Sequence, residues 1–175
     1  MMTKKKIIIE PDPILRKKST KVIKVDDYVK KLMDDMLETM YAAPGIGLAA
    51  AQIGVLKQII VIDIAKGDEK KNPLFLINPA IISTSKSTST YEEGCLSIPG
   101  YFAEIQRPAE CQINYVDYNG KEKKLNANGL LSTCVQHEID HLNGILFIDY
   151  LSKLKKDRII KKLVKQKKEE GKIIL

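Results

Sequence analysis

The 175-residue sequence lacks long apolar segments, cysteine-rich stretches and, almost entirely, histidine. No apolar run approaches the length of about 18 residues that spans a bilayer, and the apolar part of the basic start, MMTKKKIIIEPDP, is too short for a signal peptide. We therefore expect no membrane partner and a cytoplasmic location. The odd number of cysteines, three, favours reduced thiols or a metal site over a disulfide framework.

Most of the chain also has no net charge. The sequence contains 29 Lys and Arg against 22 Asp and Glu, a net charge of +7. Residues 153–172 hold ten basic and three acidic residues, which leaves 19 of each sign elsewhere. Nucleic acid is therefore a candidate partner for the tail alone. The length predicts one domain, residues 1–175, with a basic C-terminal helix and tail at residues 152–175.

Hydrophobic spacing predicts the secondary structure. Between Asp26 and Ala43 the apolar residues recur at i, i+3, i+4 and i+7, which indicates an amphipathic helix capped by Asp26 or Asp27. The other expected elements are buried strands at 58–65 and 74–79, a loop or exposed hairpin at 83–93, two strands joined by Asn119-Gly120, a helix at 130–142 stopped by Asn143-Gly144, and a last helix at about 152–168. This order predicts an α+β fold, with antiparallel or mixed sheets packed around a central helix and a further helix at the C-terminus.

The only two histidines, His137 and His141, lie four residues apart in the sequence QHEIDH. On a helix this spacing places both rings on one face, about 6 Å apart along the axis, so both can reach one metal ion. Two hydrogen-bonded histidines on a helix face are the alternative. The pair is the entire histidine content and Glu138 adjoins it, so we favour a metal site in the predicted central helix.

A catalytic metal site of this type needs a third protein ligand and an open position for water. Cys134 lies about 10 Å along the helix axis from His141, too far to share an ion with it. Cys111 alternates with apolar residues in a predicted strand, which is typical of a core thiol. Cys95 lies among glycines and a proline in EEGCLSIPG, where the backbone can present its side chain, and it is the ligand by elimination.

Three motifs, in this order, resemble the signature motifs of the peptide deformylases: GIGLAAAQ at 45–52, EGCLS at 93–97 and QHEIDH at 136–141. The similarity covers nearly the whole chain, and the absence of a long insertion between the first two motifs resembles the short bacterial and organellar type. The resemblance implies hydrolytic removal of the formyl group from N-terminal formyl-methionine of new polypeptides, with release of formate. It also implies one divalent metal ion, Fe(II) in vivo with Zn(II), Ni(II) or Co(II) as substitutes, bound by Cys95, His137 and His141.

The same resemblance implies roles for the residues around the metal. Glu138 would take a proton from the attacking water and deliver it to the departing amine, while Gln52 and the backbone N–H of Leu96 match the family's oxyanion donors. The substrate backbone and the methionine pocket are assigned to Gly45, Ile46, Gly47, Gly94, Leu130, Thr133 and Cys134. Asp140 lies on a different helix face and is expected to pack the helix or support a ligand.

This sequence departs from the family's pattern at Tyr91 and at Gly100-Tyr101-Phe102, where many relatives carry other residue types. The resemblance therefore does not predict substrate contacts beyond the methionine.

Two other functions fit parts of the sequence. Zinc endopeptidases share H-E-x-x-H, but their third ligand usually follows downstream, where Asp149 and Glu169 are the only weak candidates. A binding module whose basic tail docks on RNA would explain the charge of residues 153–172. Ribosome docking, which the resemblance implies for this helix in some deformylases, would suit an enzyme that acts on emerging chains.

Overall fold

The computed structural model describes residues 3–173, so the first two residues of the basic start and residues 174–175 of the predicted tail lie outside the described residues. The elements follow the chain as η1 (Pro13–Arg16), α1 (Asp27–Ala42), β1 (Gly47–Ala49), η2 (Ala50–Ile53), β2 (Ile59–Ile62), β3 (Leu74–Thr84), β4 (Thr88–Cys95), β5 (Ile98–Pro108), β6 (Glu110–Val116), β7 (Glu122–Asn128), α2 (Gly129–Leu142), η3 (Phe147–Tyr150) and α3 (Lys153–Ile173).

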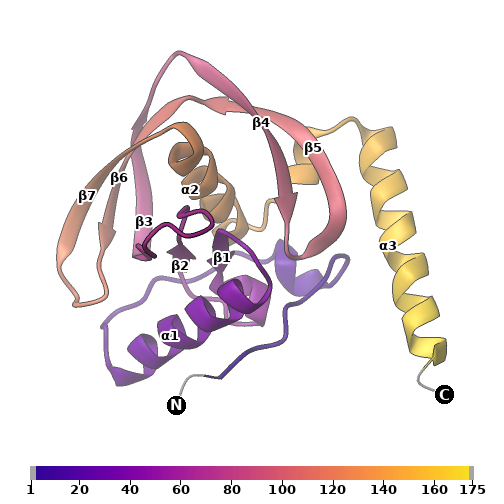
Figure 1. Ribbon diagram of the computed structural model, residues 1–175, viewed down its shortest axis with the longest axis horizontal. Coiled ribbons are helices and arrows are strands. Elements are labelled where there is room, and N and C mark those ends of the chain that lie inside the picture. The colour runs from indigo at the N-terminus through magenta and orange to yellow at the C-terminus, as the bar shows by residue number, and fades with distance from the viewer. Residues whose placement is uncertain (1–2, 174–175) are drawn as a thin grey trace.

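The strands form two antiparallel sheets. Five of them make one sheet in the order β1-β2-β3-β6-β7, and β4 pairs with β5 in a separate long hairpin. Figure 1 shows α2 in the middle of the molecule, between the larger sheet and this hairpin. The predicted α+β fold, with sheets around a central helix, is confirmed.

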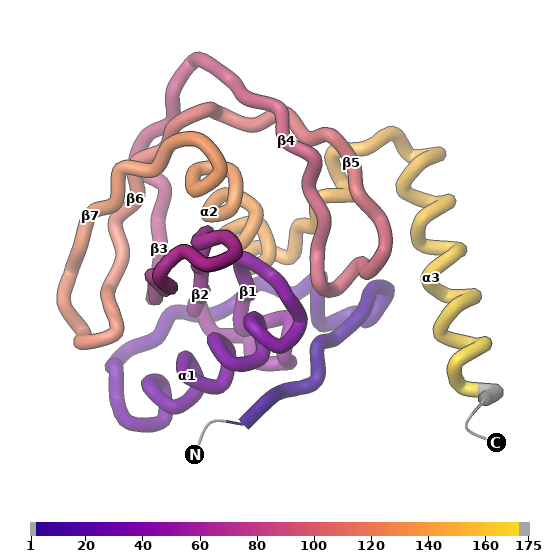
Figure 2. Tube along the Cα trace, in the orientation of Figure 1, coloured from indigo at the N-terminus to yellow at the C-terminus, as the bar shows by residue number. Residues whose placement is uncertain are grey.

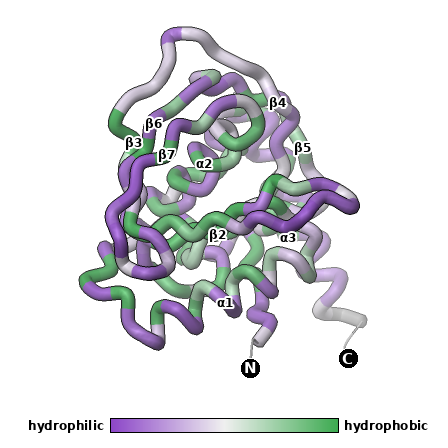
Figure 3. Tube along the Cα trace, turned by 60° about the vertical axis from the view of Figure 1, so that its left-hand side comes forward, coloured by the Kyte–Doolittle hydropathy of each residue, from purple (hydrophilic) through white to green (hydrophobic). Residues whose placement is uncertain are grey.

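The β1–β2 end of the larger sheet is buried on both faces because α1 and α2 cover it from opposite sides. Along β2, Ile60 and Ile62 pack in the core that α2 closes, whereas Ile59 and Val61 pack in the core beneath α1. Successive side chains of a strand point to opposite faces, so an uninterrupted apolar strand such as IIVI needs cover on both sides. In Figure 3, β2 is green throughout, while α1 alternates between green and purple as an amphipathic helix does.

The helix ends agree with the signals in the sequence. Asp26 caps α1, accepting a hydrogen bond from the Val29 N–H at 2.9 Å. Asn143 caps the C-terminus of α2, and Gly144 follows with φ of +73°, a conformation that favours glycine. The Asn119-Gly120 turn joins β6 to β7 as predicted.

The prediction of a loop or exposed hairpin at residues 83–93 is confirmed in part, because residues 85–87 lie between strands and residues 88–93 belong to a partly exposed hairpin strand. Most of this segment is β4, whose partner is β5 at residues 98–108, a strand that the sequence did not indicate. The apolar face of this hairpin comes from Ile98 and Ile105 on β5, and Phe147 and Leu163 from the C-terminal part of the chain cover it. Threonine-rich β4 therefore has little apolar periodicity of its own, although threonine suits an exposed strand.

The C-terminal helix α3 lies at the edge of the molecule, on the side opposite β7 (Figure 1). Leu163, only 3% exposed, anchors it to the apolar core beneath β5 with help from Ile159 and Ile160. The remaining surface of α3 is lined with exposed lysines. Within residues 3–173, no helix is both long and apolar enough to cross a membrane.

The N-terminal segment runs past α1 toward the hairpin turn, as the indigo trace in Figure 2 shows. The Ile8 N–H donates to the Gln52 carbonyl at 2.8 Å, and the Glu10 N–H donates to the Ser97 carbonyl at 2.9 Å. The segment thus connects η2 to the turn between β4 and β5.

Candidate active site

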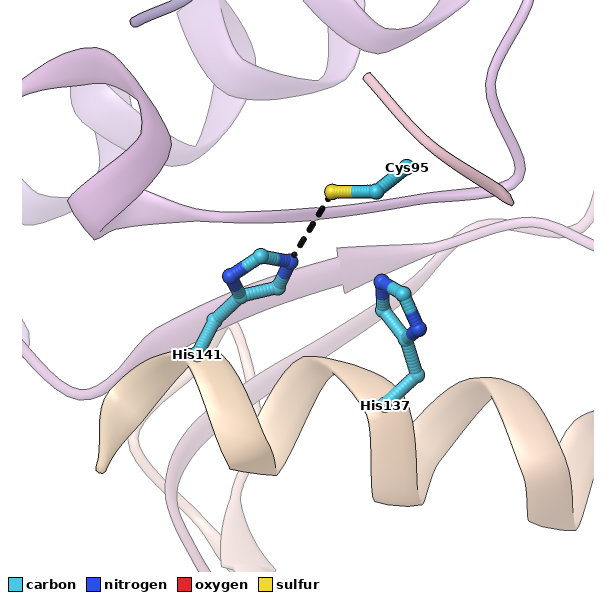
Figure 4. Close-up of side chains that lie close together, drawn as sticks. All are labelled: Cys95, His137 and His141. Atoms are coloured by element: carbon cyan, nitrogen blue, oxygen red, sulfur yellow. Dashed lines mark hydrogen bonds between the residues drawn. The ribbon is translucent and has the colours of Figure 1, made fainter. Parts of the chain in front are cut away.

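The structure brings Cys95, His137 and His141 together. One ligand atom from each lies within 4.8 Å of the others, and the Cys95 Sγ is 3.3 Å from the His141 Nε2. Figure 4 shows the two rings rising from successive turns of α2 toward the sulfur at the end of β4. The four-residue spacing thus places the two imidazoles on one face of α2, and the β4–β5 hairpin supplies the thiol from the opposite side.

A tight turn presents Cys95 to the helix. Gly94 pairs with Phe102, but Cys95 pairs with Ile98, so the register is irregular at this point and the hairpin closes through only two residues. Such irregularities re-aim side chains near functional sites. The Cys95 side chain is half-buried, whereas both histidines are buried.

A buried carboxylate orients His137. The His137 Nδ1 donates to the Glu93 Oε2 at 2.9 Å, so its Nε2 is left for the cluster. Arg107 holds Glu93 with two hydrogen bonds, Nε to Oε1 at 2.6 Å and Nη2 to Oε2 at 3.0 Å. Burial would raise the pKa of Glu93, but hydrogen bonds from His137 and Arg107 lower it below its usual value, so Glu93 stays a carboxylate.

The same arginine extends the network across α2. Its Nη1 donates to the Asp140 Oδ2 at 2.8 Å, and the Tyr150 hydroxyl donates to the same oxygen at 2.7 Å. Asp140 therefore faces away from the three clustered side chains and toward Arg107. Sequence reasoning missed Glu93 and Arg107. Glu93 is part of the EGCLS motif, but the register of β4 and β5 pairs Arg107 with Ser89, so only the side-chain contacts show that Arg107 reaches Glu93.

The donor set fits a divalent transition-metal ion. One thiol and two imidazoles are the ligands that Fe, Zn, Ni and Co accept. Burial lowers the pKa of His141 well below its usual value, which favours the neutral imidazole that a metal ligand needs. Burial instead raises the pKa of the Cys134 thiol, and Cys134 is not part of the cluster.

Glu138 is a buried carboxyl group that lines a cavity next to the three donors. Burial raises its pKa from 4.5 to about 7, and its Oε2 has no hydrogen-bond partner within the part of the chain that the structure describes. The absence of a side chain at Gly47 makes room for it, because a Cβ there would lie 2.9 Å from the Glu138 Cδ and 3.0 Å from the Cys134 Sγ.

The Gln52 amide has a fixed orientation beside the cluster. Its Oε1 accepts from the Ala49 N–H at 2.9 Å, which turns the Nε2 toward the Ser97 Oγ at 3.1 Å and the Cys95 Sγ at 3.5 Å. Leu96 directly follows Cys95, and its side chain packs where a Cβ on Gly45 would lie, 2.7 Å from the Leu96 Cδ1.

A cavity of about 440 Å³ opens above these residues, and most of its lining is apolar. Its walls include every residue that the family resemblance assigned to the substrate, namely Gly45, Ile46, Gly47, Gly94, Leu130, Thr133 and Cys134. Tyr91 and Phe102, two positions where the sequence departs from the pattern, also line it. The residues are therefore placed together, and their roles remain predictions.

The sequence model of the family described as polypeptide deformylase matches residues 4–157. The chain belongs to the peptide deformylase family. It is 61% identical over 166 residues to a peptide deformylase from Pelagibacter ubique, covering 95% of this chain and 96% of that one, and 58% identical over 170 residues to one from Rhizobium meliloti, covering 97% and 98%.

Solved structures of deformylases have the same fold. A crystal structure of peptide deformylase from Ehrlichia chaffeensis superposes with a TM-score of 0.89 at 44% identity, covering 94% of this chain and 97% of that one. The structure of the protein from the same organism in complex with actinonin gives 0.90 at 46% identity, covering 94% and 98%. This chain is thus a hydrolase of the metal-dependent deformylase family, and the endopeptidase alternative finds no support.

Proposed function

We propose that this deformylase removes the formyl group from N-formylmethionyl peptides with a divalent ion bound by Cys95, His137 and His141. The observation that carries the proposal is the convergence of these three donors within 4.8 Å beside the buried Glu138, which lines the apolar cavity. The ion in vivo is Fe(II), and Zn(II), Ni(II) or Co(II) can replace it. A thiolate ligand makes the site soft and favours these metals over Mg(II) or Ca(II).

The protein's own groups carry the protons and the charge. A divalent ion held by Cys95, His137 and His141 would supply Lewis acidity, which lowers the pKa of a nearby water and polarises a carbonyl. Glu138 accepts the proton of the attacking water and returns it to the departing amine, a task suited to a carboxyl whose pKa is about 7. The Gln52 Nε2 and the Leu96 N–H donate to the oxyanion that forms on the formyl group.

Two strand edges bind the peptide backbone and the cavity takes the methionine. The segment of Gly45, Ile46 and Gly47 leads into β1, at the edge of the large sheet, and Gly94 belongs to β4 opposite. Leu130 and Cys134 on α2 line the cavity with apolar surface. Apolar selection of this kind discriminates by only about 1 to 3 kcal/mol per methylene, so a preference for methionine rather than strict exclusion is expected.

The direct test is formate release from formyl-Met-Ala by enzyme purified without oxygen, with bound metal quantified in the same sample. Formate release in proportion to bound metal, abolished by a chelator and restored by Fe(II), supports the proposal. Stoichiometric metal without formate release would refute it. A casein assay run in parallel would detect an endopeptidase through metal-dependent cleavage of internal peptide bonds.

The Gln52→Ala variant is expected to lower kcat by about 10²- to 10³-fold, because one preorganised oxyanion donor is removed. Ser97→Ala is the matched control, since it removes the hydroxyl next to the Gln52 Nε2 and leaves the amide in place. We expect it to cost less than about tenfold. Equal reductions in both variants, or unchanged kcat in Gln52→Ala, would show that the amide does not stabilise the oxyanion.

The enzyme acts in the cytoplasm on chains emerging from the ribosome, and α3 docks there through its lysines. Three free cysteines suit a reducing compartment. The full excess charge of the chain lies in residues 153–172, and Leu163 fixes α3 to the body so that its exposed lysines face outward.

Changing Lys161, Lys162 and Lys167 to glutamine is expected to weaken ribosome binding. The slope of log K against log salt concentration should become less steep by about 0.7 to 0.9 for each phosphate that is no longer neutralised. These side chains are exposed, so the substitutions preserve the core around Leu163. Changing three exposed lysines of the β6–β7 hairpin, Lys121, Lys123 and Lys124, removes the same charge elsewhere and is the control. Equal effects in both variants, measured by sedimentation with ribosomes at several salt concentrations, would leave α3 without a special role.

A further inference from the structure

Two apolar side chains at the mouth of the cavity remain in contact with solvent. Ile46 precedes β1 and is 39% exposed, whereas Phe102 lies on β5 and is 64% exposed. Building on the function proposed above, we propose that Phe102 is a specificity residue: it selects formylated chains whose third residue, two positions after formyl-methionine, is apolar or aromatic.

The Phe102 ring lies directly on the backbone of β4. Gly94 is its cross-strand partner, and a Cβ on Gly94 would lie 2.5 Å from the Phe102 Cε1 and 2.6 Å from the Cδ1. The missing side chain therefore lets the ring settle over the residue that precedes Cys95. This contact fixes one side of the ring, while Phe102 lines the cavity and remains largely exposed to solvent.

An extended peptide has a place to bind between two strand edges. In the described part of the chain, β1 is the terminal strand of the large sheet and pairs only with β2, while β4 pairs only with β5. Residues next to both free edges line the cavity. A peptide that adds to such edges is held by backbone hydrogen bonds, and alternate side chains select its sequence.

Alternation then identifies the substrate residue that meets Phe102. In an extended peptide, side chains two residues apart point to the same face, about 7 Å from each other. When the methionine side chain occupies the cavity, the second side chain points away from it. The third returns to the cavity side at the mouth, where the ring of Phe102 offers apolar surface.

A negative charge at the mouth of the cavity further limits which third residues the enzyme should accept. Among the residues that line the cavity, Glu92 is the exposed charged one, whereas Glu93, His137 and Glu138 are buried. A carboxylate on the third residue would approach Glu92 with like charge. The expected order of preference at this position is therefore leucine or phenylalanine, then serine, then aspartate.

A purely structural role for Phe102 has a different signature. An aromatic ring that covers a cross-strand glycine can serve the hairpin alone. Its removal would then lower stability, or lower activity on every substrate by the same factor. A role in selection predicts that the ratio between substrates changes.

The experiment compares kcat/KM of the metal-loaded enzyme for formyl-Met-Ala-Leu, formyl-Met-Ala-Ser and formyl-Met-Ala-Asp amides. We expect leucine to exceed serine by about tenfold, and Phe102→Ser to reduce this ratio below about twofold. Phe102→Tyr, which keeps an aromatic ring, should retain the preference. Tyr28→Ser, which removes an aromatic side chain 66% exposed on α1, should leave the ratio unchanged.

The inference is overturned if Phe102→Ser keeps the wild-type ratio of kcat/KM between the leucine and serine peptides, or if it lowers kcat/KM equally for all three peptides. It is also overturned if a formyl-Met-X-Ala series shows a larger preference at the second residue than the first series shows at the third. Should Phe102→Ser fail to fold, Phe102→Tyr and the wild-type measurements at the second and third substrate residues still test the inference. If the wild-type enzyme released no formate, the proposed function would fail instead. Calorimetric binding of Met-Ala-Leu against Met-Ala-Ser would then test the apolar preference alone.

Discussion

Replacing Glu138 with glutamine is expected to lower kcat for formate release by about 10²- to 10⁴-fold, the contribution of a positioned acid–base group. The amide has the size of the carboxyl group and cannot carry a proton from water to the leaving amine. The three donors that we assign to the metal are unchanged in this variant. Metal content should therefore equal that of the wild type, which separates a chemical defect from a loss of the ion.

The same substitution should raise stability while it removes activity. Burial raises the pKa of Glu138 from 4.5 to about 7, so the folded state holds a proton that the unfolded state releases between these pH values. The free energy of unfolding of the metal-free wild type therefore falls as pH rises through this range, by up to about 3 kcal/mol. Glutamine avoids this loss. Urea titrations should find the variant more stable at pH 8 and the two proteins alike at pH 4; a variant less stable at pH 8 would contradict this account.

Replacing Arg107 with methionine is expected to destabilise the protein by about 3 to 5 kcal/mol, because Glu93 and Asp140 lose a buried partner. Metal affinity should fall by about 10- to 100-fold as well, since Glu93 would no longer be held in the position that orients His137. Denaturant unfolding of the metal-free protein measures the first effect, and competition with a chelator for Co(II) measures the second.

Arg16 offers a matched control for that experiment. It also bridges two carboxylates, with its Nη2 3.0 Å from the Glu10 Oε1 and its Nη1 2.6 Å from the Asp149 Oδ2, but neither of them contacts a histidine. Arg16→Met should lower stability and change the metal affinity less than Arg107→Met does, because Arg16 acts on His141 only through its charge and not through a hydrogen-bonded carboxylate. If Arg107→Met lost stability without any change in affinity, Glu93 would not act through His137.

The sequence predicted those structural features that depend on one local pattern. The spacing of apolar residues gives α1 and α2, Asn119-Gly120 gives the β6–β7 turn, and four-residue spacing gives two histidines on one face. The three short motifs also predict which residues meet at the site. Each of these features depends on residues that are neighbours along the chain or repeat at a fixed interval.

What the sequence could not predict depends on partners that are distant along the chain. The apolar cover of β5 comes from Phe147 and Leu163, about 40 to 60 residues downstream, so the hairpin shows no clear strand pattern by itself. Arg107 lies opposite Ser89 in the register of β4 and β5, and it reaches Glu93 only through its long side chain, which no sequence pattern shows. The placement of Phe102 over Gly94 depends on the same register.

The shortness of β1 has a consequence for solubility. An unpaired strand edge is a template on which any extended chain can pair, including another copy of the same protein. An enzyme that works among unfolded polypeptides meets such chains constantly. With only three residues, Gly47–Ala49, this edge can hold a short peptide end but offers too few backbone groups to start a growing aggregate.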